Sequence, residues 1–195
     1  YYVDTYGMHS IHGRAPAIAT VVATAREDVA AFVITGDGDA LSIGGNHLIH
    51  VLRRNVNLTI LLFNNRVYGL TKGQYSPTSE IGKVTKSTPM GSLDNPFNPV
   101  SLALGAEATF VARTLDMDRN HTQALLQAAY EHEGSAFIEI YQNCNVFNDK
   151  AFIQLTGKEE RVHNRIDLEI GKPIVFDGGA NAVVVRDGQA TVVDS

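Results

Sequence analysis

The stretch GDGDALSIGGNHLIHVLRRNVNLTILLFNN, from Gly36 to Asn65, organises this chain of 195 residues. One short apolar run ends at its Gly-Asp-Gly, and a second apolar run ends at its Asn-Asn. The 25 residues between them, from Asp39 to Phe63, have the length of one strand-to-strand crossover through a helix. Ligands of a parallel α/β sheet bind beyond the carboxyl ends of its strands, so we expect the two polar sites to meet at one edge of a sheet.

The rest of the chain repeats this alternation of strand and helix. Short apolar, β-branched runs predict buried parallel strands: AFVIT (31–35), LTILLFN (58–64), ATFVART (108–114) and SAFIEIYQ (135–142). Helical patterns lie among them: APAIATVVATAR (15–26), ALSIGGNHLIHVLRR (40–54) and MDRNHTQALLQAAYEHE (117–133). This order predicts an α/β fold with a doubly wound parallel sheet over residues 1–150.

Two segments depart from this pattern. Residues 66–99 are rich in Gly, Pro, Ser and Thr, and a loop of that length is usually functional or disordered. Residues 151–195 carry Asp-Gly pairs at 177–178 and 187–188 between β-prone runs. We expect β-hairpins there, in a C-terminal tail that docks on another subunit.

The composition excludes several classes of function. A net charge of −5, with 19% charged residues, provides no basic face for nucleic acid. No apolar run approaches the roughly 20 residues of a membrane helix, and the start of the sequence does not resemble a signal peptide. The single cysteine favours a reducing cytoplasm. The first residue is Tyr1 and not methionine, so we expect the natural protein to extend further at its N-terminus.

The Gly-Asp-Gly triplet is suited to holding a metal. Gly36 and Gly38 let backbone approach a ligand closely, and Asp37 offers a hard oxygen donor of the kind Mg²⁺ prefers. Taken alone, the triplet could also be a turn with an exposed aspartate. The Asn-Asn pair at the end of the next strand favours the metal site, because it adds polar donors at the same edge.

Gly-Asp-Gly followed after about 25 residues by Asn-Asn resembles the thiamine-diphosphate signature. The resemblance implies that Asp37, Asn65 and the backbone carbonyl of Val67 ligate the Mg²⁺ that holds the diphosphate. Over residues 1–155 the chain also resembles the β subunit of 2-oxoacid:ferredoxin oxidoreductases, closest to the 2-oxoglutarate type. Four segments carry this second resemblance: DTYGMHSIHGRAPAIAT, the opening stretch, YGLTKGQYSPTS and NPVSLALGAEATFVAR.

The family resemblance implies a reaction and partners. The reaction is the coenzyme A-dependent oxidative decarboxylation of 2-oxoglutarate to succinyl-CoA, with electrons passed through a [4Fe-4S] cluster to ferredoxin. The glutamate that activates thiamine diphosphate is expected on a separate α subunit, so we expect the isolated chain to be inactive. Three alternatives remain open: a subunit acting on pyruvate or another 2-oxoacid, a domain of another thiamine enzyme such as an acetolactate-synthase type, and a regulatory subunit that binds a nucleotide diphosphate.

The loop YGLTKGQ follows the predicted metal site directly. By resemblance, its first four residues wrap the diphosphate and thiazolium: Tyr68, Gly69, Leu70 and Thr71. Lys72 is the residue we expect to favour 2-oxoglutarate, because a cation can bind the second carboxylate of this substrate. The alternative is a solvated surface lysine.

Three further residues are candidates by resemblance. His12, in the segment His-Gly-Arg, is expected to line the cofactor cleft as a catalytic residue, or else to be a structural histidine, with Arg14 a weaker candidate. His47 follows a Gly-Gly-Asn and is expected near the diphosphate, whereas His50 is expected to pack. Cys144 would be the fourth cluster ligand, or else a buried small apolar residue. A [4Fe-4S] cluster needs four thiolates, and the other three are absent from this sequence.

Overall fold

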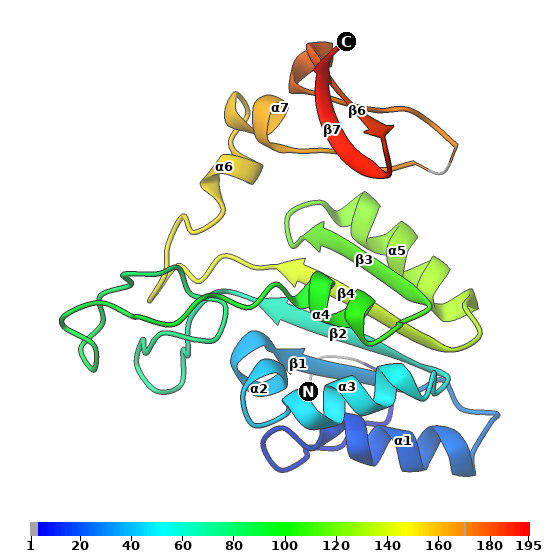
Figure 1. The fold of residues 1–195 in the computed structure, drawn as a ribbon. Coiled ribbons are helices and arrows are strands. Elements are labelled where there is room, and N and C mark those ends of the chain that lie inside the picture. The colour runs from blue at the N-terminus through cyan, green and yellow to red at the C-terminus, as the bar shows by residue number, and fades with distance from the viewer. Residues whose placement is uncertain (1–3, 170) are drawn as a thin grey trace. The chain divides into compact units, whose positions relative to one another are not determined.

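The computed structural model describes residues 4–169 and 171–195. The chain divides into two compact units, with the division between Ala151 and Phe152. The first unit contains four strands and five helices within the described residues, and the second contains three strands and three short helical segments. Figure 1 labels these elements along the chain.

The first unit is built on a parallel sheet in the strand order β1-β2-β4-β3. The expected doubly wound α/β fold is thereby confirmed, and the strands lie within two residues of their expected ends. Their bounds are β1 Phe32–Gly36, β2 Leu58–Asn64, β3 Phe110–Leu115 and β4 Ser135–Tyr141. The central strands β2 and β4 are buried along most of their length, which explains their continuous apolar sequences.

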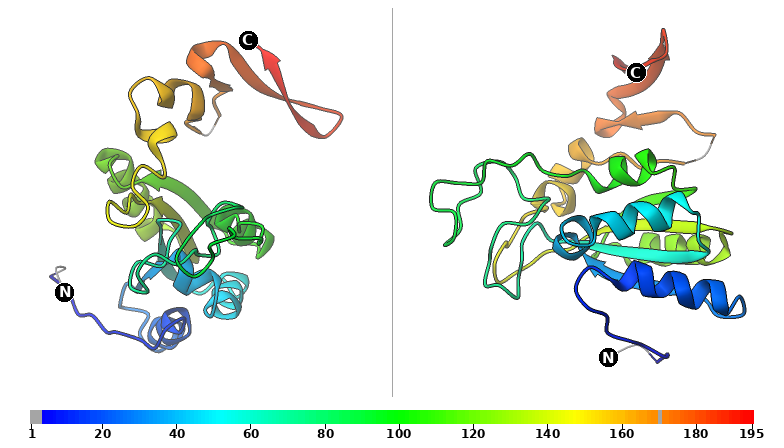
Figure 2. Two further views of the ribbon diagram at one scale, coloured as in Figure 1. Left: turned by 90° about the vertical axis from the view of Figure 1, so that its left-hand side faces the viewer. Right: turned by 60° about the horizontal axis from the view of Figure 1, so that its bottom comes forward.

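Helices cover both faces of this sheet (Figures 1 and 2). One core packs α1 (Ala15–Ala25), α3 (Gly45–Arg53) and α4 (Pro99–Gly105) against one face around Leu52 and Phe137. The other core packs α5 (Arg119–Glu131) against the opposite face around Ile138. The short α4 was not expected from the sequence; Asn98 caps it by accepting a hydrogen bond from the Ser101 N–H.

The prediction of a single helix over residues 40–54 is wrong. The segment forms α2 (Asp37–Leu41) and α3, with a turn at Ser42–Gly44 between them. The Gly44 N–H donates to the Asp39 carbonyl oxygen across 3.0 Å, and a Cβ at Gly44 would lie 2.6 Å from that oxygen. Gly13, at φ +72°, crosses at the same point, since a Cβ there would lie 2.7 Å from the Gly44 nitrogen. The break therefore brings the His12 segment against the turn between α2 and α3.

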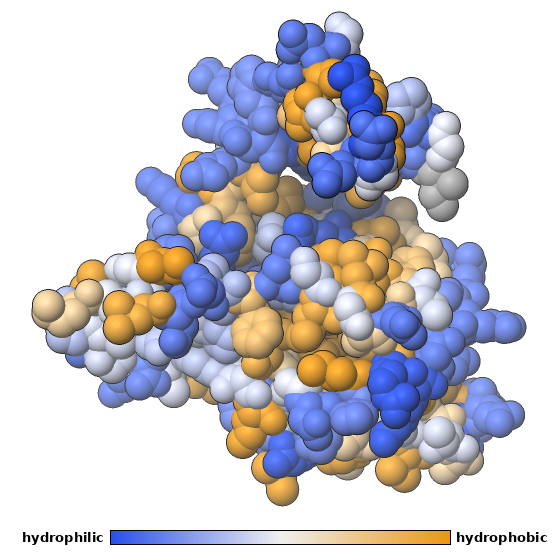
Figure 3. Space-filling view, in the orientation of Figure 1, coloured by the Kyte–Doolittle hydropathy of each residue, from blue (hydrophilic) through white to orange (hydrophobic). Residues whose placement is uncertain are grey.

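Residues 66–98 form a long loop with turns and isolated bridges (Figure 1). Its outer part projects from the sheet and carries exposed apolar side chains, visible as separate patches on the projection in Figure 3. These include Ile81, Val84, Met90 and Leu93. Its inner part turns back to the carboxyl ends of β1 and β2.

The second unit contains an antiparallel sheet in the order β5-β6-β7. Asp187 and Gly188, both at positive φ, form the two-residue turn that joins β6 to β7. The element bounds are α6 Ile153–Thr156, α7 Glu160–Asn164, β5 Ile174–Phe176, η1 Asp177–Gly179, β6 Asn181–Arg186 and β7 Gln189–Asp194. A subunit-docking role for this tail stays a prediction. Among the described residues, no helix has both the length and the apolar composition needed to cross a membrane.

Candidate cofactor-binding site

Asp37 lies at the point where β1 passes into α2. Gly36 is extended there, and Asp37 begins the helix. The Asp37 side chain is buried, and its Oδ2 accepts hydrogen bonds from Ser76 Oγ at 2.5 Å and Thr78 Oγ1 at 2.6 Å. Burial raises the pKa of the Asp37 carboxyl, and the two hydroxyl hydrogen bonds offset this only in part. The alternative of an exposed turn aspartate is therefore excluded.

The Asn-Asn pair lies beside Asp37, as the strand order predicts. The backbone N–H of Asn65 lowers the pKa of the Asp37 carboxyl, and the Asn65 side-chain oxygen accepts from the Val67 N–H at 3.2 Å. Asn64 is buried and was not among the expected site residues. The Thr78 hydroxyl lies 2.9 Å from Asn64 Oδ1 and 2.6 Å from Asp37 Oδ2, so it bridges the ends of β1 and β2.

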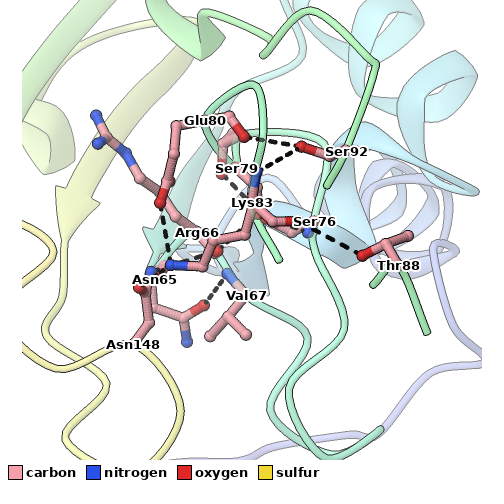
Figure 4. A network of polar contacts seen from close by, with 11 residues as sticks. Asn65, Arg66, Val67, Ser76, Ser79, Glu80, Lys83, Thr88, Ser92 and Asn148 are labelled. Atoms are coloured by element: carbon pink, nitrogen blue, oxygen red, sulfur yellow. Dashed lines mark hydrogen bonds and ion pairs between the residues drawn. The ribbon is translucent and has the colours of Figure 1, made fainter. Parts of the chain in front are cut away.

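The turn at Asn65–Val67 is held from two sides (Figure 4). Ser79 Oγ donates to the Arg66 carbonyl oxygen across 2.8 Å. From the loop after β4, Asn148 Nδ2 donates to the Asn65 carbonyl oxygen across 2.9 Å. Sequence reasoning missed both side chains. The only signal for Ser79 was its place in the segment YSPTS, where hydroxyl residues are concentrated.

Tyr68 packs against the Gly-Asp-Gly turn. Its hydroxyl donates to the Gly38 carbonyl oxygen across 3.0 Å, and a Cβ at Gly38 would lie 2.2 Å from Tyr68 Cε1. Tyr68 also opens a small hairpin: its N–H donates to the Gln74 carbonyl oxygen and its carbonyl accepts from the Gly73 N–H. Leu70, Thr71 and Lys72 form the exposed tip of this hairpin.

Family comparison agrees with this geometry. A family model described as "Thiamine pyrophosphate enzyme, C-terminal TPP binding domain" matches residues 1–140. The chain belongs to this thiamine pyrophosphate enzyme family.

Individual relatives are similar over most of the chain. The 2-oxoglutarate oxidoreductase subunit KorB of Mycobacterium tuberculosis is 67% identical over 190 residues, covering 96% of this chain and 50% of the relative. The 2-oxoacid:ferredoxin oxidoreductase 1, subunit beta, of Aeropyrum pernix is 43% identical, covering 91% of this chain and 55% of the relative. The resemblance to β subunits of the 2-oxoglutarate type is thereby confirmed. The chain spans about half the length of the curated relatives it matches.

One solved structure is similar as well. The 2-oxoglutarate:ferredoxin oxidoreductase from Magnetococcus marinus, solved with 2-oxoglutarate, coenzyme A and succinyl-CoA bound, is 46% identical with a TM-score of 0.75. The match covers 77% of this chain and 52% of the other.

For a chain of the thiamine pyrophosphate enzyme family, the donor set at Asp37 fits a hard divalent cation. At the ends of β1 and β2 lie the Asp37 carboxylate and the side-chain amide oxygens of Asn64 and Asn65. In the described part of the chain, the Asp37 carboxylate accepts from the Ser76 and Thr78 hydroxyls, and no Lys, Arg or His pairs with it. A bound Mg²⁺ would supply the positive charge that is missing beside the Asp37 carboxylate, and Mg²⁺ prefers oxygen ligands of the kind found here.

His12 contacts Asp39, the residue that directly follows the Gly-Asp-Gly triplet. Its Nδ1 contacts Asp39 Oδ1, the same oxygen that accepts the Gly13 N–H at 2.7 Å. Asp39 Oδ2 accepts from Thr35 Oγ1 at 2.7 Å. The contact uses Nδ1, so Nε2 is the ring nitrogen left for a ligand, and the His12 side chain is 58% exposed. Asp39 orients this histidine and was missed by sequence reasoning. The catalytic role of His12 stays a prediction.

The remaining candidates are less closely connected to Asp37. Arg14 Nη1 donates to the Ile43 carbonyl oxygen across 3.5 Å at an exposed position. His47 is half-buried in the first turn of α3, and His50 lies in the same helix with Nδ1 buried.

Cys144 is half-buried in the loop after β4, where its carbonyl accepts from the Asn148 N–H. Within residues 4–169 and 171–195, no group of three or more His, Cys, Asp or Glu side chains could hold a metal. A cluster role for Cys144 stays a prediction.

Proposed function

We propose that this chain is the diphosphate- and Mg²⁺-binding part of the β subunit of a 2-oxoglutarate:ferredoxin oxidoreductase. In the complete enzyme, 2-oxoglutarate and coenzyme A would be converted to succinyl-CoA and carbon dioxide, with two electrons passed to ferredoxin. The observation that carries the proposal is the buried Asp37 carboxylate at the end of β1, which the Thr78 hydroxyl links to Asn64 at the end of β2. It occurs in a chain 67% identical to a 2-oxoglutarate oxidoreductase subunit.

The residues of this chain would bind and orient the cofactor. Asp37, the side chain of Asn65 and the Val67 carbonyl would hold Mg²⁺. Tyr68, through its hydrogen bond to the Gly38 carbonyl, would keep the Gly36–Gly38 turn in place to bind the diphosphate. Thiamine diphosphate, when bound, supplies the carbanion-stabilising chemistry that allows a 2-oxoacid to lose carbon dioxide. Gly69, Leu70 and Thr71 would cover the bound cofactor, and His47 would approach the diphosphate from α3.

Electron transfer requires groups beyond this chain's own side chains. Cys144 would be one ligand of a [4Fe-4S] cluster, and the sequence contains no second cysteine to join it. The α subunit would supply the glutamate that activates thiamine diphosphate. The single cysteine also supports a cytoplasmic location, where thiols stay reduced.

The decisive test is loss of cofactor binding on removal of the Asp37 carboxylate. Titration calorimetry of the assembled α and β subunits would measure Mg²⁺-dependent binding of thiamine diphosphate. We expect Asp37→Ala to abolish this binding. The matched control is Asp28→Ala, which removes an exposed carboxylate paired with Arg26. Unchanged binding in Asp37→Ala would overturn the proposal, as would equal losses in both variants.

A further inference from the structure

Glu139, in the middle of β4, is a fully buried carboxylate outside the expected set of site residues. Its two oxygens accept from different neighbours. Arg113 Nε, on β3, donates to Oε2 across 2.6 Å, and Asn64 Nδ2, on β2, donates to Oε1 across 2.7 Å. A buried carboxylate is costly unless it is paired and hydrogen-bonded. Glu139 therefore depends on both donors.

This arrangement fixes which way the Asn64 amide faces. With Nδ2 directed at Glu139, Oδ1 points to the opposite side. There it accepts from the Arg66 N–H at 3.1 Å and lies 2.9 Å from Thr78 Oγ1. The Arg66 N–H belongs to the turn at Asn65–Val67. Glu139 thus acts on this turn through the orientation of a single amide group.

We propose that Glu139 is a positioning residue that sets the orientation of the Asn64 amide and thereby holds the Asn65–Val67 turn in its metal-binding conformation. The inference rests on the proposed function, because that function supplies the metal. It adds a residue that is not among the proposed cofactor and metal ligands. Its action follows from hydrogen-bond complementarity: two donors converge on one side chain, and only a carboxylate offers an acceptor to each.

A substitution of Glu139 by glutamine would remove one of the two acceptors that the carboxylate provides. Glutamine has nearly the same shape but only one acceptor oxygen, so its NH₂ must face either Arg113 Nε or Asn64 Nδ2, and both are donors. Rotation of the Asn64 amide would relieve the second conflict. It would then turn Nδ2 toward the Arg66 N–H and leave that backbone donor without an acceptor. A buried polar group left unpaired is costly.

The test is a double-mutant cycle in the assembled enzyme. Glu139→Gln, Asn64→Asp and the double variant are compared for Mg²⁺ affinity at saturating thiamine diphosphate, by calorimetry, and for melting temperature. We expect Glu139→Gln to weaken Mg²⁺ binding about tenfold or more. In the double variant, the glutamine introduced on β4 can donate to the aspartate introduced on β2 and still accept from Arg113. We therefore expect the double variant to bind Mg²⁺ at least about threefold more tightly than the product of the two single effects predicts. Glu133→Gln, at an exposed position just before β4, is the matched control.

Each outcome bears on the inference. Independent, multiplicative effects of the two substitutions would overturn it, as would a Glu139→Gln variant that melts earlier but binds Mg²⁺ normally. If Glu139→Gln does not fold, the double variant decides: recovery of folding with Mg²⁺ affinity near that of the parent supports the inference, and failure to fold overturns it. Asp37→Ala, measured alongside, separates the two proposals, because unchanged Mg²⁺ affinity there would reject the metal site itself.

Discussion

Asn148 donates a hydrogen bond to the backbone carbonyl oxygen of Asn65 across 2.9 Å, although 83 residues separate them in sequence. The other end of the same side chain accepts from Lys83 Nζ at 2.6 Å (Figure 4). The backbone N–H of Asn148 donates to the Cys144 carbonyl. The Asn148 side chain thus connects the loop that carries the proposed cluster ligand, in which it lies, to the turn after β2 and to the long loop. Its loss should therefore affect all three.

We expect Asn148→Ala to speed amide hydrogen exchange at residues 65–67 and 143–150, and to weaken binding of Mg²⁺ and thiamine diphosphate by about tenfold. Asn148→Asp keeps an acceptor for Lys83 but places a carboxylate against the Asn65 carbonyl, so it should be at least as harmful to the turn. Asn120→Ala, at an exposed position in α5, is the control. Exchange that changes only in the Cys144 loop would contradict a link to the turn.

The Gly-Asp-Gly turn and Tyr68 allow a sharper steric test. Gly38→Ala would bring a Cβ to within 2.2 Å of the Tyr68 ring, so the ring must move and its hydrogen bond to the Gly38 carbonyl is lost. We expect a cost of about 1–3 kcal/mol in the free energy of unfolding, measured with urea, and weaker cofactor binding.

Gly45→Ala is the matched control for this substitution. A Cβ at Gly45, the first residue of α3, meets nothing within 4 Å. Removing backbone freedom from the unfolded chain should leave this variant as stable as the parent or slightly more stable. Equal destabilisation of the two variants would argue against the Tyr68 contact as the cause.

The strands and the meeting of Asp37 with Asn65 could be predicted because both depend on patterns local in sequence. Apolar runs mark the buried strands, and the carboxyl ends of parallel strands share an edge of the sheet. The break between α2 and α3 was missed because helical spacing continues across it, while its cause is the close approach of Gly13 to Gly44. That contact exists only in the folded chain.

Much of the site's support could not be predicted for the same reason. Sequence alone does not distinguish the role of Asn64 from that of Asn65, because the partners of Asn64, Glu139 and Thr78, lie 75 and 14 residues away. Glu139 occupies a strand position that its apolar neighbours mark as core, and its polarity is explained only by Arg113 and Asn64. Such residues become visible when each buried polar atom is traced to its partner.

Burial of Asp37 predicts that this carboxyl group lowers the stability of the fold as pH rises, whereas most carboxylates raise it. The pKa of this carboxyl is raised in the folded chain, so the folded state binds more protons than the unfolded state above the ordinary value of 3.8. In the absence of a cation, the Asp37 contribution should therefore fall as pH rises from about that value through the raised folded pKa.

Asp37→Asn removes the free-energy cost of burying an ionised carboxylate. Without Mg²⁺ we expect it to melt higher than the parent at pH 7, by about 2–4 °C for each kcal/mol recovered, with the difference disappearing in acid. With Mg²⁺ and thiamine diphosphate the order should reverse, because only the parent gains binding energy. Calorimetric melting at several pH values measures both. A parent protein that melts higher than the variant in all conditions would contradict the argument.

Lys72 offers the test of substrate choice. Pyruvate and 2-oxoglutarate share the reacting 2-oxo acid, so discrimination must come from the distal carboxylate of 2-oxoglutarate. Removing a charge-assisted hydrogen bond costs roughly 1.5–3 kcal/mol, and about 1.4 kcal/mol is tenfold. In the assembled enzyme we expect Lys72→Ala to lower kcat/KM for 2-oxoglutarate by about ten- to a hundredfold and to affect pyruvate much less.

The backbone of Lys72 requires a second variant to separate charge from conformation. Its φ of +67° lies in the left-handed region, at the exposed tip of the Tyr68–Gln74 hairpin. Lys72→Gly removes the ammonium while favouring this conformation, so it should match Lys72→Ala if charge is the cause. Lys72→Arg, which keeps the charge, should retain most of the preference for 2-oxoglutarate. Equal losses on both substrates would instead assign Lys72 to cofactor binding, and no loss on either would make it a surface lysine without a role in selectivity.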